Sequence, residues 1–185
     1  EYENALNLKL EILGNDLKTK ADSVQYAEKL KELYAQHKTN GVMEKLYNTY
    51  LGLGQEAEAN TLLDNVLAAD PNNFVALADK GLALLQAQKA AEAVEYLKKA
   101  YNVKPDNPVI ATYAGTAYSV LAQDTEDAAK KKELYKEAIT FFDKAKELDP
   151  DRMSSNWGYN RYNAYYNYYG ADAPETQQAE ADSKL

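Results

Sequence analysis

The sequence predicts an all-α protein, a solenoid of antiparallel helix pairs. Pro71 and Pro105 lie 34 residues apart, and Pro150 follows in a matching context. Twelve residues before each of these prolines there is an alanine: Ala59, Ala93 and Ala138. Apolar residues follow each alanine at helical spacing, and proline cannot continue a helix. Each stripe therefore predicts one helix that ends at its proline, and a period of 34 residues is typical of stacked helical repeats.

The first half of each repeat recurs as well. Counted from three residues after the proline, the units begin at Phe74 and Pro108, and both carry glycine at position eight, Gly81 and Gly115. Glycine inside a helix costs about 1 kcal/mol relative to alanine. We therefore expect a packing role for it, where the second helix of the pair approaches closely. In the unit that begins at Asn40, the corresponding residue is a tyrosine.

These offsets resemble the tetratricopeptide repeat, whose 34-residue signature runs Leu-Gly, Tyr, Ala, Phe, Ala and Pro. The match extends from Asn40 to about Asp151. The signature tryptophan at position four is replaced by Met43, Leu77 and Ala111. The resemblance implies a TPR-type α-α superhelix in which the first helix of each pair lines a concave groove.

We expect five segments along the chain. Residues 1–39 form a divergent N-terminal helix pair, and we expect that residues upstream were removed by processing or by the design of the expressed chain. TPR units follow over 40–73, 74–107 and 108–152, and a tyrosine-rich capping helix with a polar tail occupies 153–185.

The unit over 108–152 is 11 residues longer than the repeat. Eleven residues are about three helical turns, so the insertion keeps the apolar stripe in phase. This predicts a long second helix from about Glu126 to Leu148, with Thr125 as its N-cap.

The terminal segments carry weaker patterns. Residues 2–13 and 21–37 read as two helices, with Leu10 and Leu13 among the residues that face the second helix. At the other end, Ser154 or Ser155 is expected to cap a helix that ends at Tyr169, and the tail from Gln177 is expected to fray.

Composition narrows the function. Lys and Arg number 21 against 29 Asp and Glu, and a net charge of −8 argues against nucleic acid as a partner. No apolar run is long enough to span a membrane, and the absence of cysteine excludes disulfides and thiol catalysis. With one histidine and no recognisable catalytic motif, we expect no enzyme, no catalytic residue, no metal and no cofactor. The composition is compatible with an exported or periplasmic bacterial protein but does not decide the compartment.

The resemblance also assigns residues to the groove. They are Lys45 and Asn48 in the first unit, Asp79 and Leu82 in the second, and Thr112, Tyr113 and Thr116 in the third. Some relatives grip acidic C-terminal tails of chaperones with cations at these positions. Here only Asn48 matches, and Glu44 stands where a lysine is needed. We therefore expect that chaperone-type acidic tails do not bind.

The segment 157–169 holds six of the 16 tyrosines and the only tryptophan. On a helix, Tyr159, Tyr162, Tyr166 and Tyr169 form one stripe, and the opposite stripe, with Trp157 and Ala164, faces the core. Binding candidates here are Tyr159, Arg161, Tyr162 and Tyr166. The alternatives are that the tyrosines only form a soluble end cap, and that Arg161 only stacks on a tyrosine.

The main hypothesis is an interaction scaffold whose groove receives a peptide or protein of unknown identity. The alternative is binding of an oligosaccharide or another small ligand through the Tyr/Trp/Asn-rich helix, where aromatic faces and amides could contact a sugar. An enzyme fragment and a structural spacer are weaker alternatives.

Overall fold

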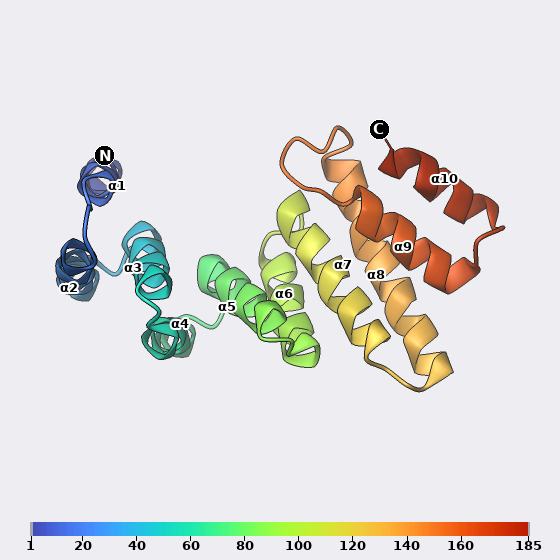
Figure 1. Ribbon diagram of the computed structural model, residues 1–185, viewed down its shortest axis with the longest axis horizontal. Coiled ribbons are helices and arrows are strands. Elements are labelled where there is room, and N and C mark those ends of the chain that lie inside the picture. The colour runs from blue at the N-terminus through green and yellow to red at the C-terminus, as the bar shows by residue number, and fades with distance from the viewer. Residues whose placement is uncertain (1, 185) are drawn as a thin grey trace. The chain divides into compact units, whose positions relative to one another are not determined.

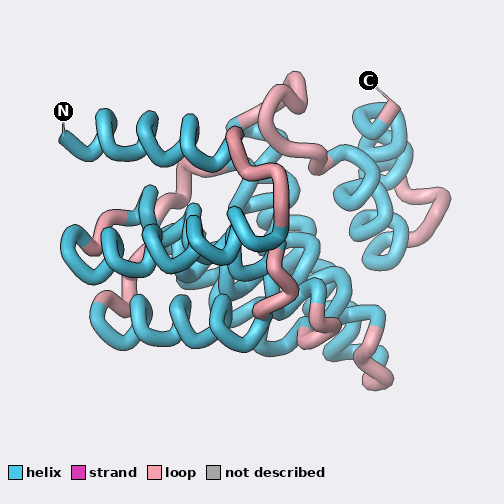
Figure 2. Tube along the Cα trace, turned by 60° about the vertical axis from the view of Figure 1, so that its left-hand side comes forward, coloured by secondary structure: helices cyan, strands magenta, loops and turns pink. Residues whose placement is uncertain are grey.

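The computed structural model describes residues 2–184, and side chains from residue 4 onward. It divides into two compact units, residues 1–71 and 72–185, each described by itself. The first unit contains α1 (Tyr2–Asn15), α2 (Lys20–His37), α3 (Asn40–Gly52) and α4 (Glu56–Ala69) (Figure 1). The second contains α5 (Phe74–Gln86), α6 (Ala90–Val103), α7 (Pro108–Gln123), α8 (Ala128–Leu148), α9 (Gly158–Tyr169) and α10 (Pro174–Ser183). Short loops join the helices, and the described residues contain no strand (Figure 2).

The first helices of the three repeats begin where the sequence register places them. The residue before each helix is an N-cap whose side-chain oxygen accepts a hydrogen bond from an amide of the first turn. Thr39 caps α3 through the Val42 amide at 3.3 Å. Asn73 and Asn107 cap α5 and α7 with N–O distances of 3.1 Å each. The caps therefore fix the start of each repeat locally.

The three alanines of the repeat register are fully buried. Ala59, Ala93 and Ala138 each have 0% exposure, in α4, α6 and α8. Because alanine leaves no bulk at these positions, neighbouring helices can pack closely there. The prediction of an all-helical stack of antiparallel pairs is confirmed by these positions and by the helix order.

The glycines at position eight have the packing role that the sequence predicts. A Cβ added to Gly81 would lie 2.5 Å from Cγ of Leu97, and one added to Gly115 would lie 2.8 Å from Cε1 of Phe142. Leu97 and Phe142 are fully buried and belong to the core cluster of the second unit. The first helix of each pair therefore touches the second through its glycine.

The long second helix of the third unit is confirmed, with one correction. Helix α8 has 21 residues and ends at Leu148 as predicted. Its N-cap is Asp127, which accepts from the Lys130 amide at 2.7 Å, and not Thr125. The Thr125 hydroxyl instead donates to the Leu121 carbonyl at 2.7 Å, so it finishes α7.

Helix α1 packs on α2 less fully than expected. Leu10 and Leu30 are buried, and the Tyr26 hydroxyl donates to the Leu10 carbonyl at 2.6 Å. The prediction for Leu13 is wrong, because its side chain is exposed. The Tyr26 ring lies against Gly14 and fills the space beside the last turn of α1.

The C-terminal segment differs most from the prediction. Helix α9 begins at Gly158 rather than after Ser154 or Ser155, because both serines bond to Asp149. The expectation of a frayed tail is wrong as well. Residues 174–183 form α10, which buries Ala179 against the core cluster.

Arg161 joins three helices in this segment. Its Nε donates to Asp143 of α8 at 2.7 Å, and its Nη1 donates to Asp182 of α10 at 2.9 Å. Burial raises the pKa of Asp182, but hydrogen bonds from Lys146 and Gln178 outweigh it and lower the pKa. Burial, followed by the hydrogen bond to Asp143, raises the pKa of Tyr165 to about 12. Through its bonds to Asp143 and Asp182, the Arg161 guanidinium holds α10 on the end of the stack.

Replacing Gly81 by alanine should destabilise the fold. The added methyl group would overlap Leu97, and overpacking of a core costs about 1–3 kcal/mol. The free energy of unfolding, measured by urea titration with circular dichroism, should fall by roughly that amount. Gly52→Ala is the matched control, since nothing lies within 4 Å of the added carbon. Equal stability of the two variants would contradict the close packing of α5 on α6.

Replacing Arg161 by alanine should loosen α10. Asp182 would lose a buried charged hydrogen bond, worth about 1.5–3 kcal/mol. Hydrogen exchange of the α10 amides should accelerate by about tenfold or more. Lys184→Ala, which removes only the exposed pair with Glu180, should leave the exchange unchanged. Unchanged protection in the Arg161 variant would show that apolar packing alone holds α10.

Candidate functional site

A polar pocket lies in the second unit between α7 and α9, and we call it the α7–α9 pocket. Its volume is about 310 Å³. One wall comes from α7 and is formed by Val109, Thr112, Tyr113 and Thr116. The other wall comes from the loop before α9 and from α9 itself, and is formed by Ser154, Ser155, Asn156 and Asn160.

The α7 wall is the face that the repeat register assigns to the groove. Thr112, Tyr113 and Thr116 are three of the predicted binding residues, and helical spacing brings them to one side of α7. Tyr113 is 37% exposed, whereas Thr112 is buried. The structure therefore brings these three predicted residues together in one pocket.

Asp149 shapes the second wall. Its Oδ1 accepts from the Met153 amide at 2.8 Å. Its Oδ2 accepts from the amides of Ser154 and Ser155 at 2.9 and 2.7 Å, and from their hydroxyls at 3.2 and 3.0 Å. The Trp157 indole donates to the Asp149 carbonyl at 2.7 Å. One carboxylate and one carbonyl therefore hold the loop that faces α7.

The environment of Asp149 lowers its pKa. Burial of the carboxyl group raises the pKa, but the hydrogen bonds from Ser154, Met153 and Ser155 outweigh burial and lower it to about 2. The group is therefore ionised at neutral pH, and a full negative charge lies directly behind the serine wall of the pocket.

The other groove candidates lie outside the pocket. Asp79 and Leu82 are half-buried on α5, which packs against α6 and α7 in the same unit. Lys45 is half-buried and Asn48 exposed on α3, in the unit of residues 1–71. Their binding roles stay predictions that follow from the repeat register.

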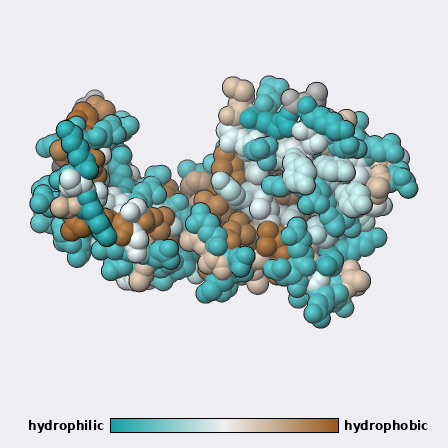
Figure 3. All heavy atoms as spheres, in the orientation of Figure 1, coloured by the Kyte–Doolittle hydropathy of each residue, from teal (hydrophilic) through white to brown (hydrophobic). Residues whose placement is uncertain are grey.

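The tyrosine stripe on α9 forms as a row of ring contacts. The ring centroids of Tyr159 and Tyr162 are 6.5 Å apart, and those of Tyr162 and Tyr166 are 6.2 Å apart. Tyr159 and Tyr166 are exposed, and the surface over α9 is pale rather than brown in Figure 3. Each of these tyrosines lies about 100° or more around the helix from Asn160. The stripe is therefore a surface apart from the α7–α9 pocket.

Arg161 is turned to the inside. It is 8% exposed, bonds to Asp143 and Asp182, and stacks 4.6 Å from the centroid of Tyr165. The stacking interpretation of Arg161 agrees with this placement. The proposed ligand contact would require these bonds to break.

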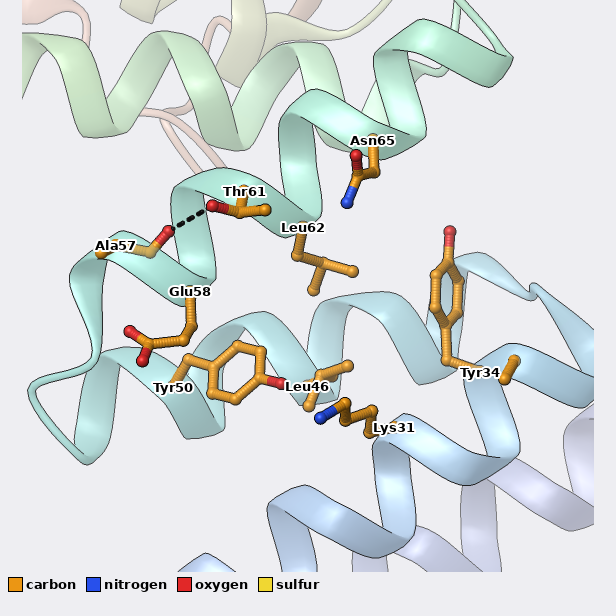
Figure 4. Close-up of a pocket in the computed structure, with 10 residues that line it drawn as sticks. Lys31, Tyr34, Leu46, Tyr50, Ala57, Glu58, Thr61, Leu62 and Asn65 are labelled. Carbon is orange, nitrogen blue, oxygen red and sulfur yellow. Dashed lines mark hydrogen bonds between the residues drawn. The ribbon is translucent and has the colours of Figure 1, made fainter.

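A larger apolar pocket lies in the first unit (Figure 4). Its volume is about 600 Å³, and it is lined by residues of α2, α3 and α4. Tyr34 and Tyr50 lie on opposite sides of it, with Leu46 and Leu62 between them. Leu46 and Tyr50 hold positions seven and eleven of the repeat that begins at Asn40, and no pocket was predicted there from the sequence.

The groove predictions also missed the loop wall of the α7–α9 pocket. Ser154 or Ser155 was predicted as a helix cap, and Asn160 is one of the amides that were assigned from the sequence only to the Tyr/Trp/Asn-rich helix. The available signal was Asp149, whose short carboxylate can bond to amides four to six residues ahead. That signal does not reveal that the loop faces α7.

Comparison with known proteins defines the class. Residues 50–113 and 127–152 match the tetratricopeptide repeat family. A structure described as "MamA AMB-1" is 23% identical, with a TM-score of 0.65, over 89% of this chain and 91% of that chain. A structure described as "Crystal structure of MamA protein" is 17% identical, with a TM-score of 0.70, over 96% of this chain and 89% of that chain. A structure described as "MamA RS-1 ArsTM double mutant" is 20% identical, with a TM-score of 0.67, over 88% of this chain and 83% of that chain. No curated protein matched.

The fold and the family matches define an all-α helical repeat protein of the interaction-scaffold class. The chain carries tetratricopeptide repeats over residues 50–113 and 127–152. The solved structures support its fold alone, since all are under 25% identical. Within residues 2–184, no helix meets the length and hydropathy needed to cross a bilayer. The same part of the chain holds no cluster of metal-ligating side chains.

Acid should release the loop of the α7–α9 pocket. The folded-state pKa of Asp149 is about 2, below its ordinary 3.8. Its stabilising contribution is therefore complete above about pH 4 and is lost as pH falls toward 2. Fluorescence of Trp157, whose indole bonds to Asp149, should change across this range. Asp149→Asn should remove this transition, whereas Asp151→Asn, on an exposed residue, should keep it. The same transition in both variants would assign it to other carboxyl groups.

Proposed function

We propose that the chain is a peptide- or protein-binding scaffold that receives a segment of its partner along the face shared by α5, α7 and α9. The observation that carries this proposal is the α7–α9 pocket. Three residues assigned to the groove by the repeat register line a single opening there. Helices of the second unit also support this wall, because α7 contacts α6, α8 and α9.

The chemistry of the pocket supports binding of a chain rather than catalysis. Its described lining offers hydroxyl and amide groups and one exposed tyrosine. Such groups bond to main-chain amides and polar side chains, and tyrosine adds rigid contact area at low entropic cost. No described residue of the lining is a cation, which supports the exclusion of acidic chaperone tails. Asp79 and Leu82 would extend the contact along α5. In the unit of residues 1–71, Lys45 and Asn48 on α3 are proposed as a contact of their own.

Truncation of groove residues should weaken capture of the partner. Tyr113→Ala removes the exposed aromatic surface of the pocket, and Asn48→Ala removes an exposed amide of α3. In a pull-down from the native host, the protein partner should be reduced about tenfold by Tyr113→Ala, in line with loss of an interface anchor. The effect of Asn48→Ala should be smaller.

Tyr96→Ala is the matched control for this test. Tyr96 is half-buried on α6, the second helix of its pair, and does not line the pocket. Thermal unfolding of all variants separates lost binding from lost stability. Full capture by both groove variants, with Tyr96→Ala equally neutral, would overturn the use of this face.

A further inference from the structure

The four serine and threonine hydroxyl groups of the α7–α9 pocket each donate a hydrogen bond within the protein. Thr112 donates to the Pro108 carbonyl and Thr116 to the Thr112 carbonyl, both at 2.9 Å. Ser154 and Ser155 donate to the Asp149 carboxylate. A hydroxyl has one proton and two lone pairs, so these groups can offer a guest only lone pairs.

The amide of Asn160 adds to this bias. One N–H of this amide donates to the Thr116 hydroxyl oxygen at 3.5 Å, and the amide oxygen of this lining residue is a further acceptor. The potential donors in the lining are the hydroxyl of Tyr113, the amide of Asn156 and the second N–H of Asn160. The described side chains of the lining therefore offer more acceptors than donors.

The negative charge of Asp149 also makes the pocket a better hydrogen-bond acceptor. The Asp149 carboxylate lies directly behind Ser154 and Ser155, and hydrogen-bond chains polarise a hydroxyl that donates to an anion, which makes its oxygen a stronger acceptor. This carboxylate carries a full negative charge, which outweighs the partial positive charge of about one half at the N-terminus of α9. No described residue of the lining supplies a cation, so a cation must come from the guest.

The size of the pocket limits what can enter. A volume of 310 Å³ is at the small end of the range of about 300–1,000 Å³ that ligand pockets occupy. It admits one long side chain rather than a helix. Val109 and the Tyr113 ring offer apolar surface to the methylene stem of such a chain, and the ring face attracts a cation.

We infer that the α7–α9 pocket takes one positively charged side chain, a lysine or an arginine, from the segment that the scaffold binds. This inference rests on the proposed function and names the partner class, a basic peptide segment. The ammonium or guanidinium donates to the threonine and serine oxygens, and the stem of the side chain packs on Tyr113.

The experiment is selection of peptides from a random displayed library by the full chain, followed by affinity measurement with synthetic peptides. Selected sequences should share a lysine or arginine at one position. Replacing that residue by norleucine in the peptide should weaken binding about tenfold, the effect of one charged hydrogen bond. Selected peptides that share no basic residue would overturn the inference and leave the proposed function standing. Failure to select any peptide would overturn both.

Variants of the chain test whether the basic side chain of the peptide binds in the α7–α9 pocket. Thr112→Val with Thr116→Val keeps the shape and removes two acceptors, so the affinity for the basic peptide should fall about tenfold. The norleucine peptide should be insensitive to this double variant. Thr140→Val is the matched control, because its hydroxyl makes the same bond to a carbonyl four residues back, at 3.2 Å, outside the pocket. A basic peptide that binds the double variant and the control equally well would overturn the pocket assignment.

Discussion

Close packing at small residues is the constraint on which the rest of this structure depends. A single helix pair cannot bury its apolar stripe, so each pair needs its neighbours. Ala93 and Ala138 have no exposed surface, and Gly81 and Gly115 lie against Leu97 and Phe142. The second helices occupy the space that these residues leave, and the opposite face of the first helices stays available to a guest.

The end of the stack is closed by polar contacts as much as by apolar ones. Arg161 links α8, α9 and α10, and its partner Asp182 also bonds to Lys146. Buried ion pairs add little net stability, but they are strongly unfavourable when one partner is missing. Arg161 therefore fixes where α10 lies more than it strengthens the fold.

Asp149 connects this closed end to the candidate site. It ends α8, holds the loop of Ser154 and Ser155, and receives the indole of Trp157 through its carbonyl. The hydrogen bonds that place the loop also engage both serine hydroxyls as donors, so these hydroxyls can only accept hydrogen bonds from a guest. The result is a pocket that accepts hydrogen bonds and has no described cation in its lining, which is the reverse of the clamps that grip acidic tails.

The repeats could be predicted from the amino-acid sequence alone, because each repeat is specified by local signals. N-cap residues fix helix starts, prolines fix helix ends, and small residues at fixed offsets mark close contacts. The register also placed Thr112, Tyr113 and Thr116 on one face of α7. Three features became visible only in the folded chain: Ser155 and Asn160 face this side of α7, Arg161 is buried, and residues 174–183 form α10. These features depend on contacts between residues such as Arg161 and Asp182, which lie 21 positions apart, and no local pattern encodes contacts of that kind.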